Sequence, residues 1–95
     1  MKNKSNWNIK SELQCLLIFK QLQADDFPRG KQMQLCRELT KYTKLEEGNL
    51  SAKVSNYKSV AGINNPSHPS SDTIKSYYKY KNTSIEDLED IIDKL

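Results

Sequence analysis

Side chains that could act as nucleophiles or as general acids and bases are few in this chain of 95 residues. The only histidine, His68, lies in a stretch rich in Pro and Ser, where an exposed loop residue is expected rather than a catalytic base. Two pairs of adjacent carboxylates, at 25–26 and 46–47, fall at the ends of predicted helices, where helix-end electrostatics explains them. Glycine-rich phosphate loops and zinc-hydrolase motifs are absent. The sequence therefore predicts a binding protein rather than an enzyme.

The two cysteines, Cys15 and Cys36, do not have the spacing of a metal site. They lie 21 residues apart, with no CxxC pair and no second cluster of ligands. Each falls within an apolar stretch with helical periodicity. We therefore expect buried, reduced thiols, and we expect neither a metal nor another cofactor.

Polar side chains of the kind that recognise nucleic acids occur in the segment 47–61. Its apolar residues recur at steps of four, three and four, which predicts a helix whose buried face comprises Leu50, Val54, Tyr57 and Ala61. Asn49, Lys53 and Asn56 then share another face. Asparagine pairs with adenine edges, and lysine reaches guanine acceptors or phosphates. These three residues are the candidate recognition residues for a major groove, and an ordinary solvated face is the alternative interpretation.

Further cations flank this predicted recognition helix. Lys58 is on the same helix, and Lys31, Arg37 and Lys41 are on the helix predicted at 31–41. A short helix, a turn and a second helix have the layout of a helix-turn-helix pair. We therefore take these four cations as candidate phosphate contacts.

Apolar periodicity predicts an all-α fold, a compact bundle of five short helices at about 9–23, 31–41, 47–61, 72–80 and 84–95. Asn8, Ser70 or Ser71, and Ser84 are the expected N-caps, and Gly62 is the expected stop of the third helix. Trp7 precedes the first cap and is expected in the core. The remaining predicted core residues are Leu13, Leu16, Leu17, Leu35, Leu39, Leu50, Val54, Tyr57, Ile74, Leu88 and Ile91. Ile9, Met33 and Leu95 are also expected on inward faces.

Charge divides the predicted single domain into two parts. Residues 1–82 carry a net charge of +7 and form a basic body, whereas residues 83–95 carry −4 and form an acidic C-terminal helix. The acidic residues of that helix are Glu86, Asp87, Glu89, Asp90 and Asp93. A basic body suits a polyanion such as nucleic acid. The longest uninterrupted apolar run is only Cys15–Phe19, so we expect a cytoplasmic protein without a membrane partner.

Three segments carry a family resemblance when they are taken in order: Trp7 ahead of LQCLLIFKQL, then LCREL, then LSAKVSNYKSVAG. Together they resemble the small helical N-terminal domain of HNH-type restriction endonucleases. The resemblance implies DNA binding. It places Lys53, Asn56 and Tyr57 at the lysine, asparagine and aromatic positions of a motif in those domains, with Val54 at its leucine. Trp7 with Glu12 approximates the opening of such domains.

Two functions follow as expectations. The first is a small module that binds or targets double-stranded DNA, either as part of a restriction endonuclease or as a stand-alone relative. The alternative is a protein-binding module, or a phage-type inhibitor of a nucleic-acid-processing partner, which would dock through the acidic helix 84–95. A homodimer is also compatible with so small a core. DNA binding requires the acidic helix to lie opposite the recognition helix.

Overall fold

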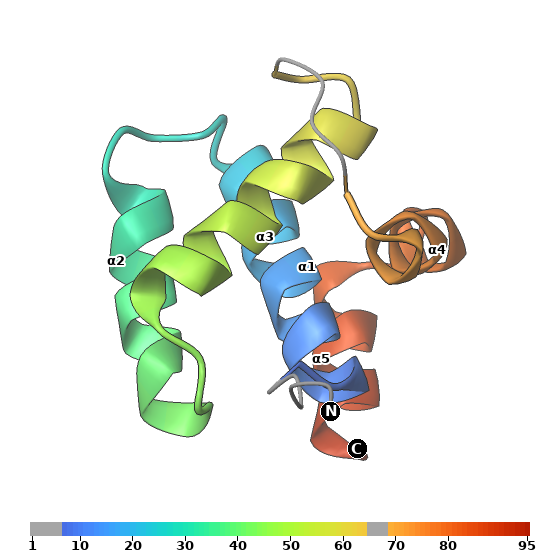
Figure 1. The fold of residues 1–95 in the computed structure, drawn as a ribbon. Helices are drawn as coiled ribbons and strands as arrows, with labels where there is room; N and C mark the ends of the chain where they lie inside the picture. Colours follow the sequence, from blue (N-terminus) through green and yellow to red (C-terminus); the bar gives the residue numbers. More distant parts are fainter. Residues whose placement is uncertain (1–6, 65–68) are drawn as a thin grey trace.

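The helix Ile9–Ala24, α1, is the central element of the fold, and four other α-helices pack against it (Figure 1). The computed structural model of the chain describes residues 7–64 and 69–95. Helix α1 begins where predicted, because the Asn8 side chain accepts from the Ser11 amide at 2.8 Å and the Ser11 hydroxyl accepts from the Asn8 amide at 3.0 Å. This reciprocal capping box fixes the start of the helix.

Two helices on one side of α1 form the expected helix-turn-helix-like pair. They are α2 (Lys31–Leu39), which continues into the 3₁₀ helix η1 (Thr40–Tyr42), and α3 (Glu47–Val60). The predicted loop after α1 is present, with Asp26 and Phe27 in the left-handed region at φ of 61° and 53°. Gly62, at φ of 79°, follows the end of α3 as predicted.

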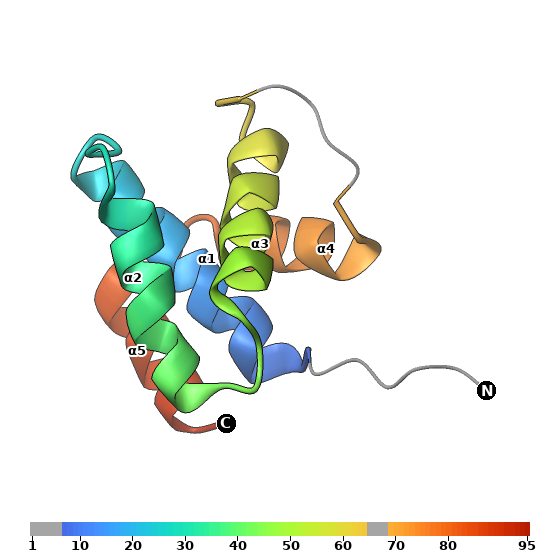
Figure 2. The same cartoon turned by 60° about the vertical axis from the view of Figure 1, so that its left-hand side comes forward.

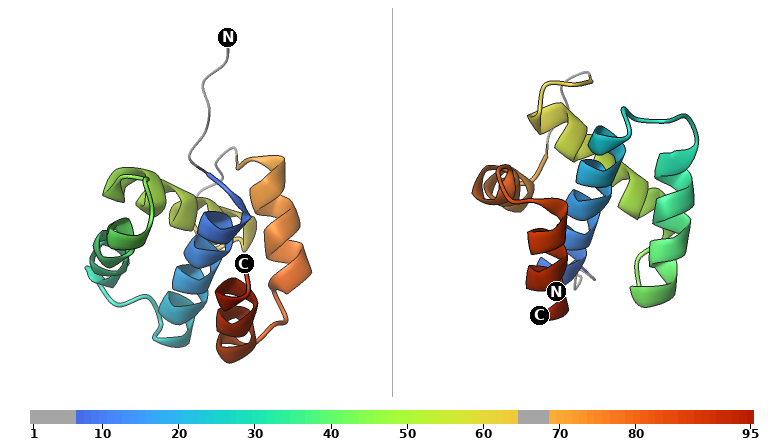
Figure 3. Two further views of the ribbon diagram at one scale, coloured as in Figure 1. Left: turned by 90° about the horizontal axis from the view of Figure 1, so that it is seen from below. Right: turned by 180° about the vertical axis from the view of Figure 1, so that it is seen from behind.

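The last two helices are α4 (Ser71–Tyr80) and α5 (Ile85–Asp93). Ser70 and Ser84 cap them through hydrogen bonds from the amides of Thr73 and Asp87. Helix α5 runs back along α1, and the view from below in Figure 3 shows α3 and α5 on opposite sides of α1. The all-α prediction is confirmed. None of the helices in residues 7–64 and 69–95 is long and apolar enough to cross a membrane.

The core forms around the buried side of α1 and contains most of the residues predicted for it. Leu13, Leu16, Leu50, Val54, Tyr57 and Leu88 are buried. Leu17, Leu35, Leu39 and Ile91 are half-buried against them, as is Trp7. Ile18, Phe19, Leu22, Leu45 and Ile92 complete the apolar core. Both cysteines are buried and free as expected, and burial raises the pKa of Cys36 to about 11.

Four predicted inward positions are wrong. Ile74 is 39% exposed because α4 turns Thr73 and Ser76 toward the interior instead. Ile9, Met33 and Leu95 are also exposed, since each lies at or near a helix end with no other element covering it. His68 lies outside the described residues.

Candidate nucleic-acid interface

Helices α2 and α3 lie side by side and are clamped together by polar contacts (Figure 2). The Gln32 amide nitrogen donates to the Ser51 carbonyl at 3.1 Å, the Ser51 hydroxyl at 2.9 Å and the Ser55 hydroxyl at 3.1 Å. Near the start of α3, the Arg37 guanidinium meets both carboxylate oxygens of Glu47 at 3.2 Å. The pair is therefore held in one arrangement along its length.

The outer surface of α3 carries short side chains just after its start, where Glu46 is the exposed N-cap and Glu47 pairs with Arg37. Gly48, Asn49 and Ala52 are exposed, whereas Asn56 is half-buried. A helix with short side chains on its exposed face can approach base edges closely. Asn49 therefore has the accessibility that its predicted role requires.

Lys53 does not lie on that exposed surface, contrary to the sequence-based expectation. Its side chain is only 11% exposed, and its ammonium lies 3.0 Å from the Glu12 carboxylate. The ammonium also donates to the Thr73 hydroxyl at 2.8 Å and sits 4.5 Å from the Trp7 ring centre. Because Trp7 and α4 cover this side of α3, Lys53 is a structural residue here.

The Glu12 carboxylate is shared between Lys53 and Tyr57. The Tyr57 hydroxyl donates to this carboxylate, and Glu12 and Tyr57 are both buried in the core. Burial, and then the hydrogen bond to Glu12, raise the pKa of Tyr57 above its usual range. Tyr57 therefore stays a protonated donor, and the one buried carboxylate of this group is balanced by the one buried ammonium.

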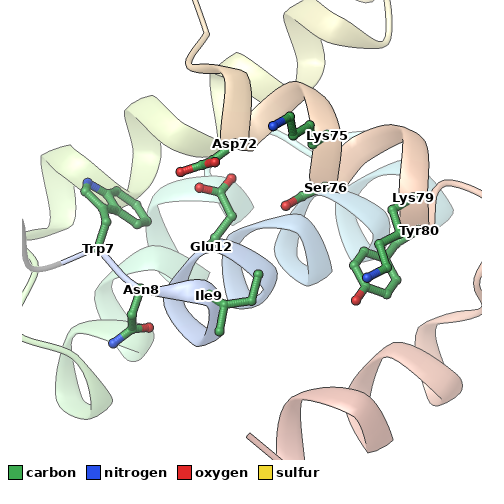
Figure 4. A pocket seen from close by; sticks show the side chains of 9 residues that line it. All are labelled: Trp7, Asn8, Ile9, Glu12, Asp72, Lys75, Ser76, Lys79 and Tyr80. Carbon is green, nitrogen blue, oxygen red and sulfur yellow. The ribbon is translucent and has the colours of Figure 1, made fainter.

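A cavity of about 480 Å³ opens beside this buried group, between the start of α1 and α4 (Figure 4). Its walls carry Trp7, Asp72, Lys79 and Tyr80, and Glu12 reaches into it from α1. Because the carboxylate of Glu12 is already engaged by its two core partners, it is not available as a free acid or base. We assign the cavity no catalytic role.

The four predicted phosphate contacts have different surroundings. Lys31 pairs with Asp25, and Arg37 pairs with Glu47. Lys58 is half-buried with its ammonium 5.4 Å from the ring centre of Phe27. Lys41 is exposed on η1. Carboxylates beside Lys31 and Arg37 reduce the positive potential they offer to a phosphate, so Lys41 is the best placed of the four.

The structure brings Lys41 together with cations that the sequence analysis did not select. A groove of about 570 Å³ lies between the start of α1 and the turn that leads into α3. It is lined by Trp7, Asn8, Lys10, Ser11, Gln14, Lys41, Tyr42, Thr43 and Lys44. Three lysines and two aromatic rings line it, without a carboxylate among these nine residues. We call it the basic groove.

The basic groove has the composition of a surface for a polyanion. Tyr42 is 78% exposed, so its ring is open to a ligand. Lysines neutralise phosphates, and aromatic rings stack on bases or pack on sugars. Sequence reasoning missed this site because its residues come from segments 7–14 and 41–44, which only the fold unites. The sequence carries no clear signal for this site, because Glu12 lies two residues from Lys10 and Glu46 lies two residues from Lys44, and only the fold leaves both carboxylates out of the groove lining.

The acidic residues lie on the other side of α1. Glu86, Asp87, Glu89, Asp90 and Asp93 are all exposed on α5. Helix α5 is separated from α3 by α1 (Figure 3). The strongest negative charge of the chain is thus kept away from the exposed surface of α3.

No family model, curated protein or solved structure matches the chain. Its function is therefore inferred from its own residues and their geometry. The features that bear on function are the basic groove, the exposed start of α3 and the acidic helix on the far side of α1.

Proposed function

We propose that this protein binds double-stranded DNA, with the basic groove holding the phosphate backbone and the start of α3 meeting the major groove. The observation that carries the proposal is the composition of the basic groove: Lys10, Lys41 and Lys44 with Trp7 and Tyr42, and no carboxylate among its lining residues. Phosphate contacts of this kind supply most of the affinity of a DNA-binding protein. The proposal is one of binding and not of catalysis.

The position of the groove relative to α3 supports this proposal. Lys41 and Lys44 lie in the connection that leads directly into α3. In helix-turn-helix proteins the N-terminal residues of the second helix contact base edges, while neighbouring residues contact the backbone. Asn49, exposed in the first turn of α3, is then the residue nearest to the bases, and Asn56 lies two turns further along.

Two further features agree with DNA as the ligand of this surface. The acidic helix α5 is on the opposite side of α1, as the DNA hypothesis requires. The segment that resembles the motif of HNH-type restriction endonucleases forms α3 itself. Both features agree with a DNA-targeting module, and the family resemblance remains a proposal.

The test is a fluorescence anisotropy titration with a short duplex at about 50 and 200 mM salt. The logarithm of the affinity should fall linearly with the logarithm of the salt concentration, by about 0.9 per phosphate contacted. Replacing Lys41 and Lys44 together by Gln should weaken binding to every sequence and reduce that slope by about two.

A matched control carries Lys20→Gln and Lys81→Gln, which remove the same charge near the far end of α1, where the Lys20 ammonium donates to the Lys81 carbonyl. This control should bind DNA nearly as the unmodified protein does. Absence of duplex binding at about 50 mM salt and tens of micromolar protein would contradict the proposed function. Equal losses in both double variants would show that net charge acts rather than the basic groove.

A further inference from the structure

A second groove, acidic and apolar, separates α2 from α5. It has a volume of about 610 Å³ and a floor formed by α1. We call it the acidic groove; its lining includes Leu17, Leu35, Leu39, Tyr42, Ile92, Glu38, Glu89, Asp90 and Asp93. All of its charged lining residues are acidic, and these four carboxylate side chains are exposed.

This composition defines what the groove would accept. Half-buried leucines on its floor and walls offer apolar surface, and the carboxylates along its rim favour cations. A helix laid into a groove between two helices presents anchors at i and i+4. The matching ligand is therefore a short helix with apolar anchors at that spacing and lysines beside them.

Helix α4 has that pattern on its exposed face. Ile74 is 39% exposed and Tyr78 is 58% exposed, at positions i and i+4. Lys75 and Lys79 follow each of them and are exposed as well. The Lys81 ammonium lies 5.3 Å from the ring centre of Tyr78, which adds a further cation to this face. We call it the α4 face.

The α4 face and the acidic groove cannot meet within one molecule. Helix α4 packs on α1 and α3, whereas the groove opens between α2 and α5. In the view from behind in Figure 3, α4 and α2 are at opposite edges, with α1 and α5 between them. The two complementary surfaces are thus available only to different copies of the chain.

We propose that the protein self-associates, with the α4 face of one copy docked in the acidic groove of a second copy. Ile74 and Tyr78 then cover the apolar floor of the groove, and Lys75 and Lys79 meet Glu89 and Asp90 at its rim. Because the two surfaces differ, the contact is heterologous, and it either closes into a ring or continues as a chain. Lys10, Lys41 and Lys44 do not line the acidic groove, whereas Gln14 and Tyr42 line both grooves. The proposal of self-association rests on the acidic groove and the α4 face, and not on the proposed DNA binding.

The experiment is sedimentation equilibrium of the purified chain from about 10 to 500 µM, a range suited to micromolar contacts. The mean mass should rise above that of one chain as concentration increases, and it should rise less at high salt because the rim contacts are exposed ion pairs. A mass of one chain throughout this range would overturn the proposal and leave the acidic groove to another partner.

Charge reversal identifies the surfaces. Two variants are made separately: one carries Lys75→Glu with Lys79→Glu, and the other carries Glu89→Lys with Asp90→Lys. Each should self-associate at least about tenfold more weakly than the unmodified chain, because like charges then face each other. An equimolar mixture of the two should associate again, because each supplies the surface that complements the other. Unchanged association of both reversed variants, or a mixture that stays monomeric, would also overturn the proposal.

The matched control reverses two lysines of the basic groove, Lys10→Glu with Lys44→Glu. Both side chains are exposed and lie outside the proposed contact, so this variant changes the net charge as much as the reversal on α4 does. It should self-associate as the unmodified chain does, and circular dichroism checks the fold of every variant. A loss equal to that of the α4 variant would show that net charge, and not the α4 face, sets the association, and would overturn the proposal.

Discussion

At the scale of single residues, the most informative result is the position of Lys53. A helical projection of α3 places this lysine beside Asn49 and Asn56, and nothing in the sequence of α3 indicates what covers that side. The tertiary structure places Trp7 and Thr73 there, with Glu12 as the charge partner. A residue selected for binding is thus used to balance a buried carboxylate.

The substitution Lys53→Met tests this role through stability. It removes the ammonium but keeps much of the side-chain volume, so the Glu12 carboxylate is left in the core with the Tyr57 hydroxyl as its donor and no cation beside it. Breaking a buried ion pair in this way costs about 3 to 5 kcal/mol of the free energy of unfolding. Urea unfolding followed by circular dichroism measures it.

The control for this substitution is Lys44→Met, at an exposed position, which should change stability by less than about 0.5 kcal/mol. The double variant Glu12→Leu with Lys53→Met should recover part of the loss, because both buried charges are then removed. A neutral Lys53→Met variant that has lost DNA binding would instead place Lys53 on the interface, as the sequence pattern predicts.

At the scale of elements, local signals predicted where helices begin and end better than which way they face. Asn8, Ser70 and Ser84 act through side-chain hydrogen bonds to nearby amides, and Gly62 through its backbone conformation. Each of these signals depends only on residues within a few positions in the sequence. Orientation depends on distant partners, and the polar side of α4 faces inward because Thr73 hydrogen-bonds Lys53 of α3.

The orientation of α4 gives a second stability prediction. Leu50→Ala, in the fully buried part of α3, should cost about 2 to 5 kcal/mol. Ile74→Ala, at an exposed position of α4, should cost less than about 0.5 kcal/mol when measured at a low protein concentration. Urea unfolding of both variants distinguishes them. A large loss of stability on Ile74→Ala in the monomer would mean that α4 packs through the face predicted by its apolar pattern.

At the scale of the whole molecule, basic and acidic residues lie on different sides of α1, and the basic groove and the acidic groove meet at Gln14 and Tyr42. The sequence predicted a basic body and an acidic end from residue order alone, and the structure adds their placement. The basic groove lies at the start of α1, whereas the start of α5 lies by its end, where Ile85 shares a pocket with Gln21 and Ala24. Pairings across the fold of this kind are set by packing, so no single segment of sequence reports them.

The distance between the start of α5 and the basic groove predicts that the position of a charge on the surface, and not the net charge of the chain, governs the affinity for DNA. The double variant Glu86→Gln with Asp87→Asn raises the net charge by two at the start of α5. This site lies by the end of α1 and the basic groove lies at its start, so the 16 residues of α1 keep the two about 20 Å apart. Since the Debye length is about 8 Å at physiological salt, affinity should change by less than about twofold. Anisotropy titrations at physiological and low salt measure it, and only the low-salt affinity should rise appreciably. A large gain at physiological salt would show that DNA passes close to α5 and that the binding surface is wrongly placed.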